Sequence, residues 1–151
     1  MSFRGIAKNV SHDVKELEKI FGRKITGHAY PMGQFNQDVK NVLKDNGILY
    51  ARTVKSTHAF GLPKDWYEWN PTCHHGEAGT MDDIERFLRD DGALLFFLWG
   101  HAFEFDRDDN WELMEKIAGR LGGRDDIWYC TNGELYSRLA RFRAASGISA
   151  T

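Results

Sequence analysis

The sequence places a histidine where proton-transfer chemistry is expected. His101 directly follows residues 93–99, the most apolar segment of the chain. An imidazole titrates near neutral pH, and apolar surroundings would keep it partly desolvated, which suits an acid-base catalyst. The alternative interpretation is a histidine at a strand end that hydrogen-bonds a backbone carbonyl. Glu104 either orients this histidine or is a surface acid, and we expect the surface position.

Residues 71–75 hold three potential ligands for a soft metal ion, namely Cys73, His74 and His75. Successive side chains of an extended chain point to opposite faces, so we do not expect both histidines to bind one ion. The sequence has no second Cys or His pair at the spacing of a zinc finger. We therefore expect a structural or substrate-lining loop here, with a metal site as the alternative.

Three aromatic residues, Trp66, Tyr67 and Trp69, lie in a segment without helical or strand periodicity, residues 55–79. A loop of this length in a compact domain is usually functional or partly disordered. Flat aromatic rings can stack on sugars, but aromatic side chains also pin a long loop to the core. We expect the second role and keep sugar stacking as the alternative.

The other segments follow strand and helix patterns in turn. Apolar runs predict strands at residues 24–30, 48–54, 93–99 and 126–130. Amphipathic spacing predicts helices at residues 13–21, 36–46, 80–89, 110–121 and 132–144. Ser11 is expected to cap the first helix and Gly22 to end it. This alternation indicates an α/β fold with a parallel sheet covered by helices. Four strands are too few for a closed barrel of about eight, so we expect part of a barrel or a small open sheet.

Polar residues lie at the carboxyl end of each predicted strand. They are His28 with the turn Tyr30-Pro31-Met32-Gly33, Arg52 with Thr53, His101 with Glu104, and Thr131 with Asn132. Reactive groups gather at the carboxyl ends of parallel strands, because those ends meet at one edge of the sheet. We therefore expect these residues to converge on one site.

Composition limits the function classes. The chain has 151 residues, a net charge of −2, 13% aromatic residues and two cysteines. This aromatic content argues against disorder, and the cysteines are too few for a disulfide scaffold. A near-neutral charge argues against a nucleic-acid partner. The start lacks a secretory signal, and the longest apolar run is far short of the roughly 20 residues that span a bilayer. We expect a cytoplasmic protein that does not insert into a membrane.

Several stretches resemble a known family. They are residues 27–36 with the Tyr30–Gly33 turn, residues 94–101 ending in His101, residues 126–134, and the shorter segments 50–53 and 71–75. In this order they are similar to the C-terminal part of the polysaccharide deacetylase family, carbohydrate esterase family 4. The likeness spans roughly residues 13–142. It implies an irregular (β/α) barrel of mostly parallel strands with flanking helices.

The resemblance also implies a reaction and roles for particular residues. The family hydrolyses the N-acetyl group of amino sugars with a divalent metal ion, usually zinc, and an aspartate base. By resemblance, His101 protonates the departing amine, and the turn at Tyr30, Met32 and Gly33 supplies a backbone N–H to the oxyanion. Asp65 and Trp66 would lie near the carbohydrate substrate. Ala29 stands where the family has an arginine, and Arg52 is expected to supply that charge.

The family's first motifs, an aspartate pair and a His-xxx-His metal clamp, have no counterpart before Ser11. The metal ligands and the base therefore cannot be assigned. We expect one polysaccharide-deacetylase-like domain over residues 1–151 that lacks N-terminal strands, is weakly active or inactive alone, and self-associates through exposed strand edges. Two alternatives are a non-catalytic carbohydrate-binding domain and a small hydrolase with its own metal site around Cys73–His75.

Overall fold

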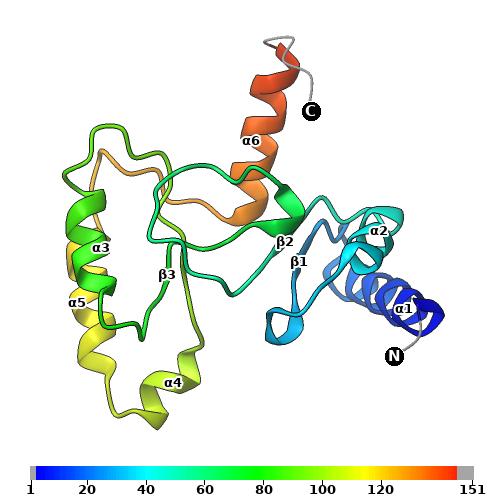
Figure 1. Ribbon diagram of the computed structural model, residues 1–151, viewed down its shortest axis with the longest axis horizontal. Coiled ribbons are helices and arrows are strands. Elements are labelled where there is room, and N and C mark those ends of the chain that lie inside the picture. Colours follow the sequence, from blue (N-terminus) through cyan, green and yellow to red (C-terminus); the bar gives the residue numbers. More distant parts are fainter. Residues whose placement is uncertain (1–2, 146–151) are drawn as a thin grey trace. The chain divides into compact units, whose positions relative to one another are not determined.

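The computed structural model describes residues 3–145 and has a mixed α/β architecture, which confirms the predicted class (Figure 1). Within these residues it contains six α-helices, two short 3-10 helices and four short strands. The chain divides into two compact units. The first consists of the residues up to Ala51 together with those from Trp128 onward, and the second consists of Arg52–Ile127.

The first unit begins with helix α1, Phe3–Phe21, which packs against α2, Gln37–Asp45. The prediction that Ser11 caps the first helix was wrong. Ile6 and Val10 extend the four-residue apolar spacing of Val14 toward the N-terminus, so Ser11 lies inside the helix. The predicted end is confirmed, because Gly22 has a φ of +61° and its N–H donates to the carbonyl oxygen of Glu18.

Helix α2 begins where its sequence predicts. The Asn36 side chain accepts a hydrogen bond of 2.9 Å from the backbone N–H of Val39, as an N-cap residue does. Val42 and Leu43 of this helix are fully buried and lie in the core of the unit. The capping residue and the apolar spacing together fix which face of α2 turns inward.

The first unit contains one pair of strands, β1 (Gly27–Ala29) with β2 (Tyr50–Arg52). Both strands are shorter than predicted. A Cβ atom at Gly27 would stand 2.4 Å from the Tyr50 ring, so glycine permits this close contact between the strands. The predicted strand at residues 126–130 does not form. Trp128 there is half exposed, and the irregular segment leads directly into α6, Asn132–Ala145.

The second unit contains the parallel pair β3 (Cys73–His74) and β4 (Leu98–Trp99), with Cys73 opposite Leu98 and His74 opposite Trp99. The predicted strand at residues 93–99 is a strand only in its last two residues, and its side chains are not buried on both faces. Hydrogen bonds to other segments explain this. The N–H groups of Leu94 and Leu95 both donate to the Phe60 carbonyl oxygen, instead of to a strand partner.

Three helices surround this strand pair: α3 (Thr80–Phe87), α4 (Ala102–Arg107) and α5 (Trp111–Leu121). Helices α3 and α5 lie side by side (Figure 1) and are joined by a two-pronged ion pair in which Arg120 contacts Glu85 at 2.6 and 2.9 Å. Helix α4 was not predicted. It is short, and it brings a carboxylate to the end of β4, as described below.

The long segment at residues 55–79 is held against the core. It contains the 3-10 helix Trp66–Glu68 and strand β3. Trp69 is fully buried, with its ring 5.0 Å from both the Trp66 and the Phe97 rings. These contacts agree with the expectation that the aromatic residues pin the loop.

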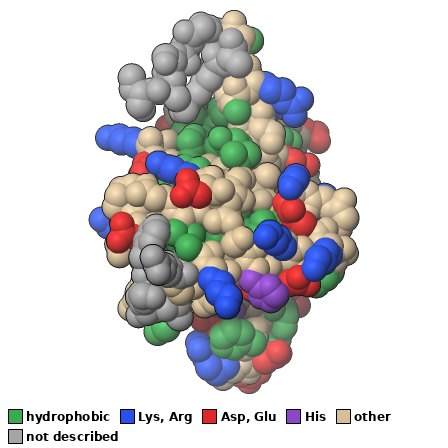
Figure 2. Space-filling model, turned by 90° about the vertical axis from the view of Figure 1, so that its right-hand side faces the viewer, with side chains coloured by type: hydrophobic (Ala, Val, Ile, Leu, Met, Phe, Trp, Pro, Cys, Tyr) green, Lys and Arg blue, Asp and Glu red, His purple; other side chains and the backbone are tan. Residues whose placement is uncertain are grey.

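Surface features of the described residues are those of a mixed-charge protein. Figure 2 shows Lys and Arg side chains next to Asp and Glu side chains on the face that it presents. Over residues 3–145, no helix has both the length and the apolar composition that crossing a bilayer requires. The same residues form two two-stranded sheets and do not close a barrel.

Candidate metal centre

Three histidines surround one carboxylate oxygen in the second unit. Oε2 of Glu104 lies 3.0 Å from Nε2 of His74 and 2.9 Å from Nε2 of His75. Nδ1 of His101 lies 3.4 Å from the same oxygen, and the backbone N–H of His101 donates to it at 3.0 Å. We call His74, His75, His101 and Glu104 the histidine cluster.

Strand pairing explains why residues so far apart in the sequence meet here. His74 ends β3, and Trp99 ends the parallel strand β4, so the carboxyl ends of both strands lie together. His101 follows β4 as the N-cap residue of α4, and Glu104 is in the first turn of that helix. Of the residues predicted to converge at strand ends, His101 and Glu104 lie here, and the structure joins them to His74 and His75, which were not in the predicted set.

The expectation that the adjacent histidines point to opposite faces was wrong. The rings of His74 and His75 are stacked, with centroids 4.4 Å apart and planes inclined by 29°. Alternation holds only inside a strand, and β3 ends at His74, after which the chain turns as Glu77 N–H donates to the His74 carbonyl oxygen. Both imidazoles can therefore reach Glu104.

The position of the His75 ring depends on its contacts with Phe105 and Gly100. Its imidazole stacks on the ring of Phe105 at a centroid distance of 4.2 Å. On another side it touches the backbone of Gly100, where a Cβ atom would stand 1.7 Å from Cδ2 of His75. Glycine at position 100 is required because any side chain would occupy the space of the imidazole.

Glu104 is an ionised and largely enclosed group. Only 13% of its side chain is exposed, so the expectation of a surface acid was wrong. Burial of the carboxylate by itself raises its pKa, but hydrogen bonds from the His101 N–H and from His75, with the nearby His74, lower the pKa from 4.5 to about 2. The carboxylate keeps its negative charge at every pH at which the protein would work.

The donor atoms suit a divalent metal ion. His74, His75 and Glu104 each offer a ligand atom, and the three atoms lie within 4.8 Å of one another. Imidazole nitrogen and carboxylate oxygen are common zinc ligands, and two ligands of one zinc ion lie at most about 4 Å apart. The separations of 2.9 and 3.0 Å between Glu104 and the two histidines meet this limit. Both pairs that include Glu104 therefore fit such an ion, while the third pair, between the two imidazoles, lies within 4.8 Å.

Binding an ion here requires a change of protonation at both histidines, because Nε2 of each ring faces the ionised Glu104. The N–H of Gly76 donates to Nδ1 of His74 at 3.1 Å, so the neutral His74 ring carries its proton on Nε2 and donates it to Glu104. A metal ligand at Nε2 must release that proton and protonate Nδ1, which ends the Gly76 hydrogen bond. Nε2 of His75 likewise donates to Glu104, so a metal-bound His75 must carry its proton on Nδ1, which is buried and, within the described residues, has no hydrogen-bond partner.

An apolar cavity lies beside the cluster. It has a volume of about 270 Å³ and is bordered by His75 and His101 on one side and by Leu98, Met114 and Ile117 on the other. The His101 side chain is 49% exposed, so it connects the cluster with solvent. A small apolar group of a ligand would fit this cavity while a polar group faces the histidines.

Arg52 borders the cluster through another side chain. Its Cζ lies 4.5 Å from the centroid of the Trp99 ring, and its Nη1 donates to the Thr53 carbonyl oxygen. Trp99 in turn contacts His74 edge-on, with ring centroids 4.5 Å apart. Burial lowers the pKa of the guanidinium of Arg52. The structure thus places a positive charge behind Trp99.

Cys73 lies outside the histidine cluster. It is fully buried, and burial raises the pKa of its thiol to about 11, so the group stays protonated near neutral pH. A protonated, enclosed thiol is a poor metal ligand. The predicted metal segment around Cys73–His75 therefore supplies its two histidines and not its cysteine.

Two further predicted residues have local roles in the second unit. The Asp65 side chain accepts a hydrogen bond of 2.8 Å from the Tyr67 N–H and so begins the 3-10 helix at Trp66. Trp66 is half-buried, with its ring edge-on to that of Trp69. Their expected contact with a substrate stays a prediction.

The predicted turn residues belong to the first unit. Tyr30 is buried and stacks on Phe35, with ring centroids 4.6 Å apart, so it is a core residue. Met32 is exposed and has a φ of +53°, and Gly33 follows with a φ of +71°. Two successive left-handed residues make this a sharp turn. His101 is in the other unit, and a joint role of the turn and His101 stays a prediction.

Sequence reasoning underestimated Glu104. The one available signal was its position three residues after His101, the spacing at which an acid in the first turn of a helix accepts from the capping residue's N–H. The contacts of Glu104 with His74 and His75 have no local signal in the sequence, since these residues lie 30 and 29 positions before Glu104.

The chain has no significant match among protein-family models, curated proteins or solved structures.

Proposed function

We propose that this protein is a metal-dependent hydrolase whose ion is held by His74, His75 and Glu104. The observation that carries the proposal is the convergence of two imidazole nitrogens on one ionised carboxylate oxygen at 3.0 and 2.9 Å. When bound, a divalent ion such as zinc would polarise a carbonyl group and make water more acidic. Residues around the ion then have to position a substrate and move protons.

His101 is the residue that we propose as the proton donor. It lies at the mouth of the cluster with its side chain half exposed, and its Nδ1 is 3.4 Å from the ionised Glu104. A carboxylate beside one ring nitrogen orients the imidazole and leaves the other nitrogen to exchange a proton with a leaving group. This role agrees with the one that the family resemblance implies for His101.

The substrate class comes from the same resemblance. We propose that the bond cleaved is the amide of an N-acylated amino sugar, in a deacetylase related to the polysaccharide deacetylases. The cavity of about 270 Å³ supports this choice, because it is lined mainly by apolar side chains and is large enough for a short acyl group. The parallel pair β3 and β4, with the cluster at its carboxyl end, also supports a barrel-type relationship.

A carbohydrate-binding domain without catalysis has less support. That function would use the aromatic residues of the loop from Trp66 to Trp69, but Trp69 is fully buried and its ring contacts Trp66 and Phe97. A stacking platform has to leave a ring face open to the sugar.

The first experiment measures metal binding by titration calorimetry with zinc on chelator-treated protein. We expect one zinc ion per chain, and at least tenfold weaker binding in His74→Gln and in Glu104→Gln. His58→Gln is the matched control, because His58 also contacts carboxylates but lies outside the cluster. Binding should be as tight in this control as in the unaltered protein.

Nuclear magnetic resonance adds a measurement, an amide chemical shift, that zinc bound elsewhere on the surface would not change. Zinc should shift the Gly76 amide resonance, since its hydrogen bond to Nδ1 of His74 must end when the ion binds. An unchanged Gly76 resonance, or equal affinity in the cluster variants and the control, would contradict the metal centre.

The second experiment measures acetate release from chitooligosaccharides by the zinc-loaded chain. We expect a low rate, because the chain alone is predicted to be weakly active, which chelation abolishes and which falls about 100-fold in His101→Ala, the size of a typical general-acid contribution. Circular dichroism would verify that the variant is folded. A rate that is insensitive to both changes would refute the proposed reaction while leaving the metal site intact.

A further inference from the structure

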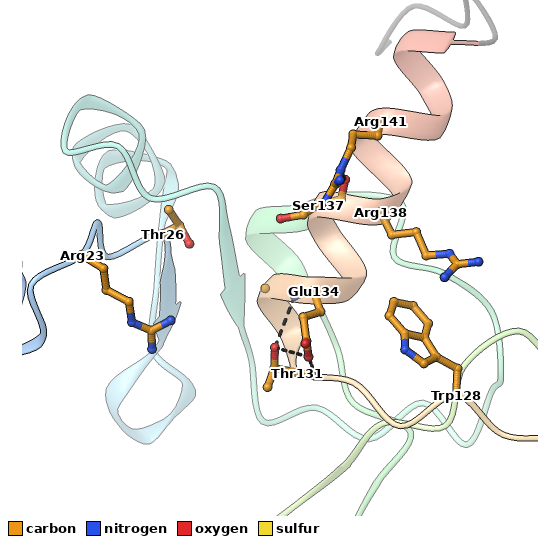
Figure 3. A pocket seen from close by; sticks show the side chains of 9 residues that line it. Arg23, Thr26, Trp128, Thr131, Glu134, Ser137, Arg138 and Arg141 are labelled. Atoms are coloured by element: carbon orange, nitrogen blue, oxygen red, sulfur yellow. Dashed lines mark hydrogen bonds between the residues drawn. The ribbon is translucent and has the colours of Figure 1, made fainter.

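A second cavity lies in the first unit, far along the chain from the histidine cluster. It is an open cleft of about 570 Å³, lined by the segment that follows α1, by Trp128 and Thr131, and by α6 as far as Arg141 (Figure 3). Arg23 and Thr26 line one side, and Trp128, Arg138 and Arg141 line the other. Residues more than 100 positions apart thus supply three guanidinium groups to one cleft.

These three arginines differ from others in the chain. Four arginines elsewhere have a carboxylate partner, and these are Arg86 with Asp83, Arg107 with Asp108, Arg120 with Glu85 and Arg124 with Asp126. Among the described residues, Arg23, Arg138 and Arg141 have no ion-pair partner. Like charges that line one cleft without counter-charges give the cleft a positive potential.

The one acid that lines the cleft already has hydrogen-bond donors. Oε2 of Glu134 accepts from the Thr131 N–H at 2.7 Å and from its hydroxyl at 2.9 Å, and the Glu134 N–H donates back to that hydroxyl (Figure 3). This is the reciprocal pattern that begins a helix, so Glu134 serves α6. Three arginines and one glutamate leave the lining with a net charge of +2.

An aromatic ring lies next to the charges. The Trp128 side chain is 49% exposed, and Cζ of Arg138 lies 4.8 Å from the centroid of its ring. Arg141 is held by a hydrogen bond of 3.3 Å from its Nε to the Ser137 carbonyl oxygen. Two arginines are therefore positioned by contacts that leave their remaining N–H donors for a ligand, and the ring adds an apolar surface.

From this lining we infer that the cleft binds a small organic phosphate monoester. Its charge near −2 matches the +2 of the lining, and guanidinium groups pair with phosphate oxygens through two parallel hydrogen bonds. The cleft is much larger than inorganic phosphate, so the ligand has an organic part of about the size of a sugar, which Trp128 would contact. This site is independent of the proposed hydrolase, because none of its lining residues belongs to the histidine cluster.

The test uses the full chain and follows the Trp128 indole resonance during titration with glucose 6-phosphate, inorganic phosphate and glucose. We expect glucose 6-phosphate to bind at least tenfold more tightly than inorganic phosphate, and glucose not to bind. Arg23→Gln and Arg141→Gln should each weaken binding of glucose 6-phosphate at least tenfold. Arg89→Gln is the control, since Arg89 is exposed and lies in the other unit, and it should bind as the unaltered protein does.

A lysine variant distinguishes recognition from loss of folding. Arg23→Lys keeps the charge but loses the planar fork, so we expect an affinity between those of the unaltered protein and Arg23→Gln. Equal binding in all variants would overturn the proposal. Inorganic phosphate that binds as tightly as glucose 6-phosphate would also overturn it, and so would a single-stranded oligonucleotide that binds 100-fold more tightly than the sugar phosphate.

Discussion

The imidazole of His75 lies so close to the backbone of Gly100 that no Cβ atom can be placed between them. The nearest ring atom, Cδ2, would be 1.7 Å from such an atom. The ring also stacks on His74 and on Phe105. Because the ring is enclosed between a backbone and an aromatic side chain, its position depends on the absence of a side chain at position 100.

Gly100→Ala should displace His75 and weaken the histidine cluster. We expect the free energy of unfolding to fall by about 1–3 kcal/mol, the usual cost of overpacking, and zinc affinity to fall with it. Urea unfolding and zinc titration measure the two effects. Gly61→Ala is the matched control, because nothing lies within 4 Å of a Cβ at position 61, and its stability should change by less than about 0.5 kcal/mol.

Stability should depend on the charge of Glu104. Its pKa is about 2 in the folded protein and 4.5 as an ordinary value, so its stabilising contribution is fully present above pH 4.5 and is lost as the pH falls toward 2. In metal-free protein, Glu104→Gln should therefore be less stable than the unaltered chain at pH 7, and this difference should vanish near pH 2. Urea unfolding at both pH values measures it.

Glu115→Gln provides the comparison for that experiment. Glu115 is an exposed acid on α5, and its substitution should change stability little at either pH. A difference between Glu104→Gln and the unaltered chain that stays constant from pH 7 to pH 2 would show that the carboxylate charge is not what stabilises the cluster.

His58 should titrate above its ordinary range. Its Nδ1 lies 2.7 Å from Oδ2 of the buried Asp83, and this hydrogen bond raises the pKa of the imidazole above 6.5. The contribution of this pair to stability is fully present below pH 6.5 and is lost as the pH rises through the folded pKa. Nuclear magnetic resonance titration should give a pKa of His58 above 6.5, and a lower one in Asp83→Asn.

Glu77→Gln should lower the pKa of His58 by less than Asp83→Asn does, because the Glu77 carboxylate lies 3.7 Å from Nε2 of His58 and acts only through its charge. An Asp83→Asn variant that is folded and keeps the raised His58 pKa would contradict the assignment of the shift to that hydrogen bond.

The two cysteines should differ in reactivity. Cys73 is fully buried with a thiol pKa of about 11, whereas Cys130 is only half-buried. We expect the native protein to react with one equivalent of a thiol reagent, slowly, at Cys130, and with two equivalents in denaturant. Cys130→Ser should abolish labelling of the native chain. Rapid modification of Cys73 without denaturant would disprove the burial of its side chain.

Local sequence signals predicted most helices of the fold. Helix α1 ends at Gly22 because this residue adopts a left-handed conformation, and α2 begins at Asn36 because its side chain accepts a hydrogen bond from the Val39 N–H. Ser11 misled the prediction because a serine inside a helix resembles a cap when only its C-terminal neighbours are considered. Signals that involve neighbouring residues alone cannot distinguish the two cases.

Strands and the cluster were harder to predict because they depend on distant partners. The apolar residues 93–97 look like a buried strand, but Phe97 N–H donates to the Thr72 hydroxyl, and Leu94 and Leu95 donate to Phe60. The sequence pointed to His101 through its place after an apolar run. It could not point to the contact between Glu104 and His74, which requires β3 and β4 to pair first.

The alignment of Cys73 with Leu98 and of His74 with Trp99 also determines which donor atom, nitrogen or sulfur, lies at the carboxyl end of the strand pair. A slip of this alignment by one residue would put the Cys73 sulfur in the place of the His74 nitrogen. The site would then prefer softer metal ions than an imidazole site does. Insertions should therefore be tolerated best at the exposed residues 89–92, which precede the hydrogen bonds of Leu94 and Leu95 to Phe60. A single residue inserted at 73–75 would instead change which metal ion the site prefers.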